Sequence, residues 1–112
     1  MKIDFSELPE IPNSHFKGGE GIFYARMFND DNVKIMRGRL APGASIGLHT
    51  HEGNSEIVYI LQGEGKMMCE SVHENLSAGD CSYCPEGQSH TLVNDSSGDL
   101  VFFAVVPEHH KN

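Results

Sequence analysis

Basic residues are scarce in this chain, which has 8 lysines and arginines against 16 aspartates and glutamates and a formal net charge of −8 over 112 residues. It contains no run of basic residues and no helix-turn-helix pattern. A surface with this charge repels phosphate backbones and anionic membranes. We therefore expect neither nucleic acid nor a membrane among its partners.

Membrane-spanning and secretory patterns are also missing. No apolar run approaches the 18 residues that indicate a transmembrane helix, and the N-terminus lacks the charged-then-apolar order of a signal segment. The three cysteines are an odd number, which fits reduced thiols better than a disulfide framework. These absences predict a soluble, cytoplasmic protein.

No convincing amphipathic helix occurs, and the length allows one domain. Residues 1–20 hold scattered apolar side chains among prolines and glycines, so we expect an N-terminal arm laid over the domain or over a partner subunit. Residues 21–112 are expected to form a single all-β domain, because short strand-like segments alternate with turn signals. The predicted strands are 21–28, 33–40, 46–51, 56–62, 66–70, 72–76, 81–84, 89–93 and 100–106. The turn residues at 29–32 predict a hairpin between the first two strands.

Four residues carry most of the functional information: His49, His51, Glu56 and His90. His49 and His51 are two apart and would point to one face of a strand. Glu56 follows a turn and opens a strand that can pair antiparallel with the first, while His90 would come from another hairpin folded over them. Only a rolled, two-sheet or barrel-like domain brings the four together easily. Three imidazoles and a carboxylate suit a divalent transition metal.

Two segments around these residues resemble the two motifs of the cupin superfamily, with no insertion and no substituted position. The matching positions are Gly43, His49, His51, Glu56 and Gly63 in the first segment, and Gly79, Pro85, Gly87, His90 and Asn94 in the second. The resemblance implies a cupin-type double-stranded β-helix, a jelly-roll barrel, with one divalent metal ion inside. By motif position, His49, His51, Glu56 and His90 would be the metal ligands.

The metal's identity does not follow from the sequence, because imidazole suits iron, manganese, zinc, nickel and copper. Four protein ligands on a six-coordinate ion leave two positions for a small anionic or chelating ligand. Three functions remain open: a dioxygenase-like enzyme, which we favour; a Lewis-acid isomerase, decarboxylase or lyase acting on a sugar or keto acid; and a non-catalytic, metal-dependent small-molecule-binding module. No catalytic residue is assigned, although Glu52, Tyr59 and Tyr83 are candidate acids or bases for the second.

Several other residues have two interpretations. Arg37 and Arg39 share one face of a strand, where they either clamp a carboxylate inside the barrel or face solvent or a subunit interface. Cys81 and Cys84 are three apart on a predicted strand and would face opposite ways, so we interpret the cysteines as buried, inert thiols.

Three further features complete the sequence predictions. His109 and His110 are expected in a solvated tail. Asn94 is expected to hydrogen-bond a turn. Residues 57–61 are apolar on both faces, which predicts that one face packs toward the lumen and the other toward another layer or subunit. Together with the apolar residues of the arm, this favours a homodimer.

Overall fold

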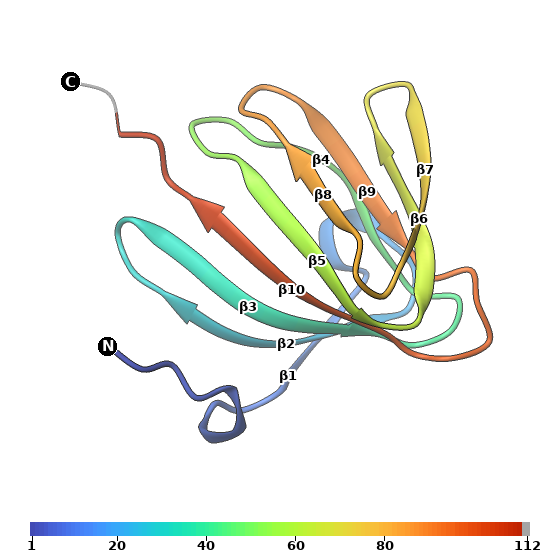
Figure 1. The fold of residues 1–112 in the computed structure, drawn as a ribbon, viewed down its shortest axis with the longest axis horizontal. Helices are drawn as coiled ribbons and strands as arrows, with labels where there is room; N and C mark the ends of the chain where they lie inside the picture. Colours follow the sequence, from blue (N-terminus) through green and yellow to red (C-terminus); the bar gives the residue numbers. More distant parts are fainter. Residues whose placement is uncertain (111–112) are drawn as a thin grey trace.

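Two antiparallel β-sheets packed face to face form the fold of the chain, in a computed structural model that describes residues 1–110 (Figure 1). No α-helix occurs among these residues, which confirms the predicted all-β class. None of their helices is long and apolar enough to cross a membrane. The elements are η1 (Phe5–Glu7), β1 (Ile11–Ser14), η2 (Phe16–Gly18), β2 (Ile22–Asn29), β3 (Val33–Leu40), β4 (Ser45–Thr50), β5 (Glu56–Gln62), β6 (Glu64–Cys69), β7 (Val72–Ser77), β8 (Cys81–Cys84), β9 (Ser89–Val93) and β10 (Leu100–Pro107).

The larger sheet has the strand order β1-β2-β3-β10-β5-β8, and the smaller has β4-β9-β6-β7. Along each strand, side chains that face the other sheet alternate with side chains that face away from it, because successive side chains of a strand point to opposite faces. In β5, for example, Val58 and Ile60 are buried while Ile57, Tyr59 and Leu61 are exposed. The buried side chains form one core, centred on Phe23, Phe102, Met67 and Leu92.

The hairpin between β2 and β3 forms where the sequence predicts it. The Asp30 carboxylate accepts hydrogen bonds from the backbone N–H groups of Asn32 and Val33, at 2.8 and 2.9 Å. Asp30 also donates its own N–H to the Val33 carbonyl. An aspartate that satisfies its own turn in this way explains why this stretch reverses the chain.

One predicted pairing is wrong: β4 and β5 do not lie side by side. β4 pairs with β9, where His49 lies opposite His90, while β5 pairs with β10 and β8 in the other sheet. The turn at 52–55 therefore crosses between the two sheets. The sequence suggests a hairpin here because the turn is short. The chain passes to the larger sheet instead, because β5 buries Val58 and Ile60 in the core from there.

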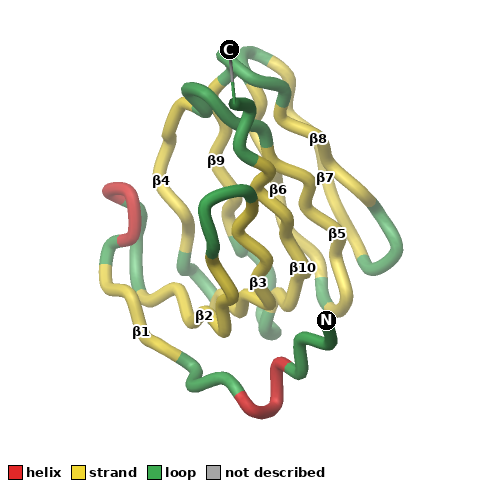
Figure 2. Tube along the Cα trace, turned by 90° about the vertical axis from the view of Figure 1, so that its left-hand side faces the viewer, coloured by secondary structure: helices red, strands yellow, loops and turns green. Residues whose placement is uncertain are grey.

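The chain from the N-terminus to β1 runs along the end of the molecule away from the C-terminus, and η2 then lies beside β4 (Figure 2). Strand β1 adds an edge strand to the larger sheet by pairing with β2, and Phe5 packs edge-on against Phe103 at 6.1 Å between ring centroids. The division of the chain into an arm at 1–20 and a domain at 21–112 remains a prediction, and its last two residues, 111–112, lie outside the described residues.

Asn94 is fully buried and organises the turn before β10, as predicted. Its amide nitrogen donates to the carbonyls of Leu40 and Gly98, both at 2.8 Å. Its side-chain oxygen accepts hydrogen bonds from the backbone N–H and the hydroxyl of Ser96. One side chain thus ties the end of β3 to the turn at 94–98.

We expect Asn94→Ala to lower the free energy of unfolding by about 2–4 kcal/mol, because four hydrogen bonds at a buried position are lost together. Urea unfolding followed by circular dichroism measures this loss. The control is Asn75→Ala, at an exposed position on β7. A loss below about 1 kcal/mol would contradict the role given to Asn94.

Candidate metal centre

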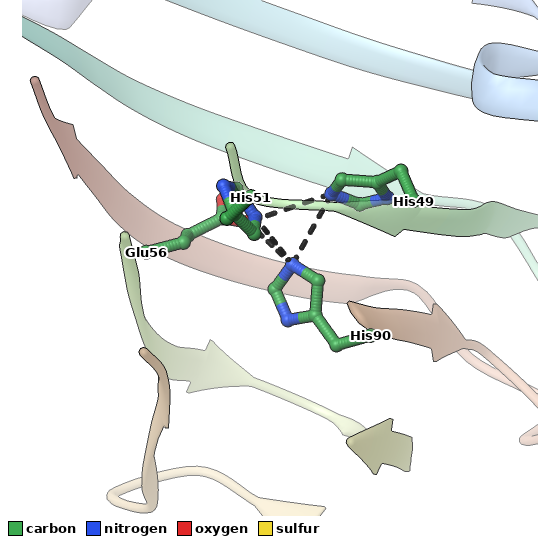
Figure 3. Close-up of side chains that lie close together, drawn as sticks. All are labelled: His49, His51, Glu56 and His90. Carbon is green, nitrogen blue, oxygen red and sulfur yellow. Dashed lines mark hydrogen bonds and ion pairs between the residues drawn. The ribbon is translucent and has the colours of Figure 1, made fainter. Parts of the chain in front are cut away.

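The four residues singled out in the sequence meet inside the barrel. His49, His51, Glu56 and His90 each place one donor atom within 4.8 Å of the others (Figure 3). His90 Nε2 lies 2.9 Å from His51 Nε2 and 3.2 Å from His49 Nε2. Glu56 Oε1 lies 2.8 Å from His90 Nε2 and 3.1 Å from His51 Nε2. With metal–nitrogen distances of 2.0–2.1 Å, adjacent ligands lie about 3 Å apart, so this spacing fits a bound ion.

In His49 and His51, the Nδ1 atom points away from the centre and makes a hydrogen bond. These two bonds show that Nε2 is the nitrogen that faces the centre with a lone pair. His49 Nδ1 donates to the Gly47 carbonyl at 2.8 Å, and His51 Nδ1 donates to the Asn54 side-chain oxygen at 2.7 Å. In the neutral ring the Nε2 atom then keeps its lone pair. Lone pairs that point at one another repel unless a cation or proton lies between them. The described chain therefore presents a donor set that could hold a metal ion.

The carboxylate keeps its charge despite its burial. Burial alone would raise the pKa of Glu56, but the imidazoles of His49, His51 and His90, which donate to Glu56 when their Nε2 atoms are protonated, outweigh burial and hold that pKa well below its usual value. The hydrogen bond to Glu56 in turn raises the pKa of His51, against the opposing effect of burial. The centre thus contains a permanent negative charge that attracts either protons or a metal cation.

Both sheets contribute to the centre. β4 carries His49, His51 directly follows it, and β9 carries His90, while Glu56 opens β5 on the opposite sheet. His51 is fixed further by its backbone, which donates its N–H to Gln88 and accepts the N–H of Gly87. The loop after β8 therefore holds His51, which lies just beyond the last residue of β4.

Gly47 allows η2 to lie close to β4. A Cβ atom added at Gly47 would lie 2.0 Å from the Lys17 carbonyl oxygen, closer than any side chain permits. This approach brings η2, and with it Lys17, to the rim of the site. No local pattern in the sequence predicts this contact, because it depends on a backbone distance between remote segments.

The C-terminal histidines are exposed to solvent, as expected, but hydrogen bonds hold both of them against neighbouring loops. His109 donates its backbone N–H to the Gly53 carbonyl at 2.8 Å, and its Nε2 lies 2.9 Å from the Ser55 hydroxyl. His110 Nε2 lies 3.0 Å from the Asp31 carbonyl oxygen. The segment thereby fastens the loop that carries Asn54, the partner of His51.

Two cavities adjoin the donors. The inner one, of about 30 Å³, is lined by His49, Glu56 and His90 and otherwise by apolar side chains such as Phe23, Met36 and Phe102. A second, of about 170 Å³, shares His49 and Glu56 with the first, and Lys17, Lys34 and Glu52 line it. A small cavity beside the donors and two lysines near them suit a small anion.

The structure places the remaining candidates outside the lumen. Arg37 and Arg39 project from the outer side of β3, where Arg39 pairs with Glu10 at 2.9 Å and stacks over Tyr24. Tyr59 and Tyr83 are 42% and 60% exposed on the outer side of β5 and β8. Cys81 is exposed and Cys84 buried, so the predicted opposite facing is confirmed, but the cysteines are not all buried.

This fold and donor set define a small double-stranded β-helix with a candidate metal site in its lumen. The chain belongs to the cupin family, since its residues 36–106 match the cupin domain. It is 35% identical over 112 residues to an oxalate-binding protein of Thermotoga maritima, covering 95% of this chain and 93% of the relative. It is 31% identical over 84 residues to a germin-like protein of Morus alba, covering 67% of this chain and 38% of the relative.

A solved structure resembles the whole fold. The crystal structure of a predicted oxalate decarboxylase from Thermotoga maritima superposes with a TM-score of 0.91 at 33% identity, covering 96% of this chain and 99% of that one. The agreement extends over both sheets, so the two-sheet barrel described above is shared by the two proteins.

We expect His49→Ala to weaken divalent-metal binding by more than about 100-fold while the barrel stays folded, since changes to residues that merely orient a ligand already cost about 10–100-fold. Metal content after dialysis and circular dichroism measure the two effects. His73→Ala, at an exposed position on β7, is the matched control. Full metal content in the His49 variant would overturn the ligand assignment.

Proposed function

We propose that His49, His51, Glu56 and His90 ligate one divalent transition metal ion, and that this centre binds a small dicarboxylate of the oxalate class. The observation that carries the proposal is the convergence of three imidazole nitrogens and one ionised carboxylate oxygen within 4.8 Å. Iron, manganese, zinc, nickel and copper all suit these donors. When bound, such an ion supplies a Lewis acid with open positions for anionic oxygens.

Charge and size support a small anion as the ligand. Three neutral imidazoles and one carboxylate leave a divalent ion with a net charge near +1. Lys17 and Lys34 add positive charge at the wider cavity, in a chain whose overall charge is −8. The inner cavity of about 30 Å³ has room for about two water molecules. Two carboxylate oxygens can occupy adjacent coordination positions, and a relative is named an oxalate-binding protein.

The apolar lining favours binding over acid–base catalysis. Among the described residues, the inner cavity offers no acid or base other than three of the donor residues, His49, Glu56 and His90. Tyr59 and Tyr83, two of the candidates for Lewis-acid isomerase, decarboxylase or lyase chemistry, face away from it. Glu52, at the wider cavity, is the remaining candidate. This leaves metal-dependent capture of the ligand as the activity that we favour.

Dioxygenase chemistry is the second candidate. It rests on the apolar cavity beside the donors, because dioxygen is an apolar molecule that such a cavity admits. The dioxygenase activity remains a prediction from the sequence, as does the cytoplasmic location. Oxygen uptake by the metal-loaded protein in the presence of oxalate or a chelating metabolite would move the proposal from binding to catalysis.

We expect the metal-loaded protein to bind oxalate in isothermal titration calorimetry, and Lys17→Ala or Lys34→Ala to weaken this binding by a few-fold each, since exposed charges contribute modestly. Lys66→Ala is the matched control, because Lys66 pairs with Asp95 at another cavity. Because oxalate is itself a chelator, the metal content of the protein is measured after ultrafiltration: retained metal shows that oxalate bound to the centre and did not extract the ion. Heat that persists in the metal-free His49→Ala variant would contradict the proposal.

We also propose that the chain forms a homodimer through the outer side of β5 and β8. Ile57, Tyr59, Leu61 and Tyr83 are each 41–60% exposed and lie on adjacent strands. The N-terminal arm packs against this same sheet at Phe103, but the packing leaves these four side chains uncovered. A continuous apolar surface of this kind is typical of a protein interface.

We expect light scattering to give twice the 12.3 kDa of one chain. Tyr59→Glu should shift the mass to that of a monomer, because it buries an unpaired charge in the interface. Val72→Glu is the control, since Val72 is also an exposed apolar residue but lies on β7 of the other sheet. A monomeric native chain across a wide concentration range would refute the dimer.

A further inference from the structure

Two cysteines from opposite sheets meet behind the candidate metal centre. Cys69 ends β6 in the smaller sheet and Cys84 ends β8 in the larger sheet, and their Sγ atoms lie 4.0 Å apart. In the strand ladders, Cys69 is the partner of His90 and Cys84 is the partner of Glu56. The pair that the sequence brings together, Cys81 and Cys84, is not the pair that the fold brings together.

The surroundings hold both sulfur atoms in this position. Cys69 Sγ donates to the Gln88 side-chain oxygen at 3.4 Å, and Cys84 Sγ donates to the Gln88 backbone carbonyl at 3.6 Å. Cys84 is 1% exposed, while Cys69 is half-buried and so remains in reach of a small solute. The two thiols therefore differ in access but share one neighbour.

We propose that Cys69 and Cys84 form a redox-active thiol pair, a modification site at which a peroxide-class oxidant produces a disulfide that links the two sheets. The sulfurs must approach from 4.0 Å to about 2.05 Å, the length of a disulfide bond. Rotation about the Cα–Cβ bonds of two contacting thiols brings them toward each other. The proposal rests on the fold and the thiols and is independent of the metal.

The reaction divides between the two residues according to their exposure. The Cys69 thiol, which solvent reaches, releases its proton, and its thiolate attacks one peroxide oxygen. The O–O bond breaks, leaving a sulfenic acid on Cys69 and a hydroxide that takes up the released proton to become water. The Cys84 sulfur then displaces hydroxide from the Cys69 sulfur, and that hydroxide leaves with the Cys84 proton as a second water. Two thiols thus lose two electrons, and one peroxide becomes two waters.

Cys84 is buried whereas Cys69 is half-buried, so Cys69 is the first sulfur that a dissolved oxidant meets. Cys81 takes no part, because it is exposed on the opposite side of β8. Cys81 therefore serves as an internal reference thiol.

The test counts free thiols in the folded, full-length protein. The reduced chain is treated with hydrogen peroxide in the presence of a chelator, then denatured, alkylated with a maleimide and weighed by mass spectrometry. All three cysteines should be labelled before oxidation and only Cys81 afterwards. Peptide mapping should find Cys69 linked to Cys84, and a reductant should restore three labels.

Cysteine variants and a urea-unfolded control distinguish a disulfide that the fold directs from random pairing of the three thiols. Cys81→Ser should still form the bond, whereas Cys69→Ser and Cys84→Ser should each keep two labelled thiols after oxidation. Oxidation in urea should give mixed pairings that include Cys81. Three labels on the oxidised native chain, a bond to Cys81, or a loss of labels that a reductant does not reverse would each overturn the proposal.

Discussion

The closure of two sheets around a buried, charged cluster is the constraint on which the rest of the structure depends. Three histidines come from the smaller sheet and its adjoining loop, and the carboxylate comes from the larger sheet, so no single hairpin could assemble them. Packing of Phe23, Phe102 and Met67 between the sheets sets the separation at which the donor atoms meet. The packing of the hydrophobic core thus also sets the positions of the donor atoms, so a change in core packing changes the geometry of the site.

A buried carboxylate is costly unless its charge is compensated. Here Glu56 has three imidazole neighbours within 4 Å, which lower its pKa and leave the cluster in need of protons or a cation. The same feature explains why two rings are fixed at Nδ1 by Gly47 and Asn54: a ring free to rotate could relieve the repulsion by turning away. His90 Nδ1 lacks such a partner among the described residues, so packing and the contact of its Nε2 atom with Glu56 orient that ring.

The sequence predicted the parts of this protein that depend on local spacing. The turn at 29–32, the strands and the four clustered residues all follow from short patterns, because strand periodicity and turn chemistry act over a few residues. It misplaced β5, because the choice of sheet depends on where the apolar side of that strand finds a partner. It also missed His109 on the Ser55 loop and Cys69 beside Cys84, since both contacts join remote segments that carry no local signal.

The docking of His109 on the Gly53–Ser55 loop has a consequence for synthesis of the protein. The first histidines of the cluster leave the ribosome half a chain before the segment that fastens their loop. Contacts between residues so far apart form late and slowly, because the intervening chain must first be ordered. The nascent chain therefore passes through a stage in which its histidines are exposed and unclamped, and it acquires a fully fastened site only when its last strand has been added.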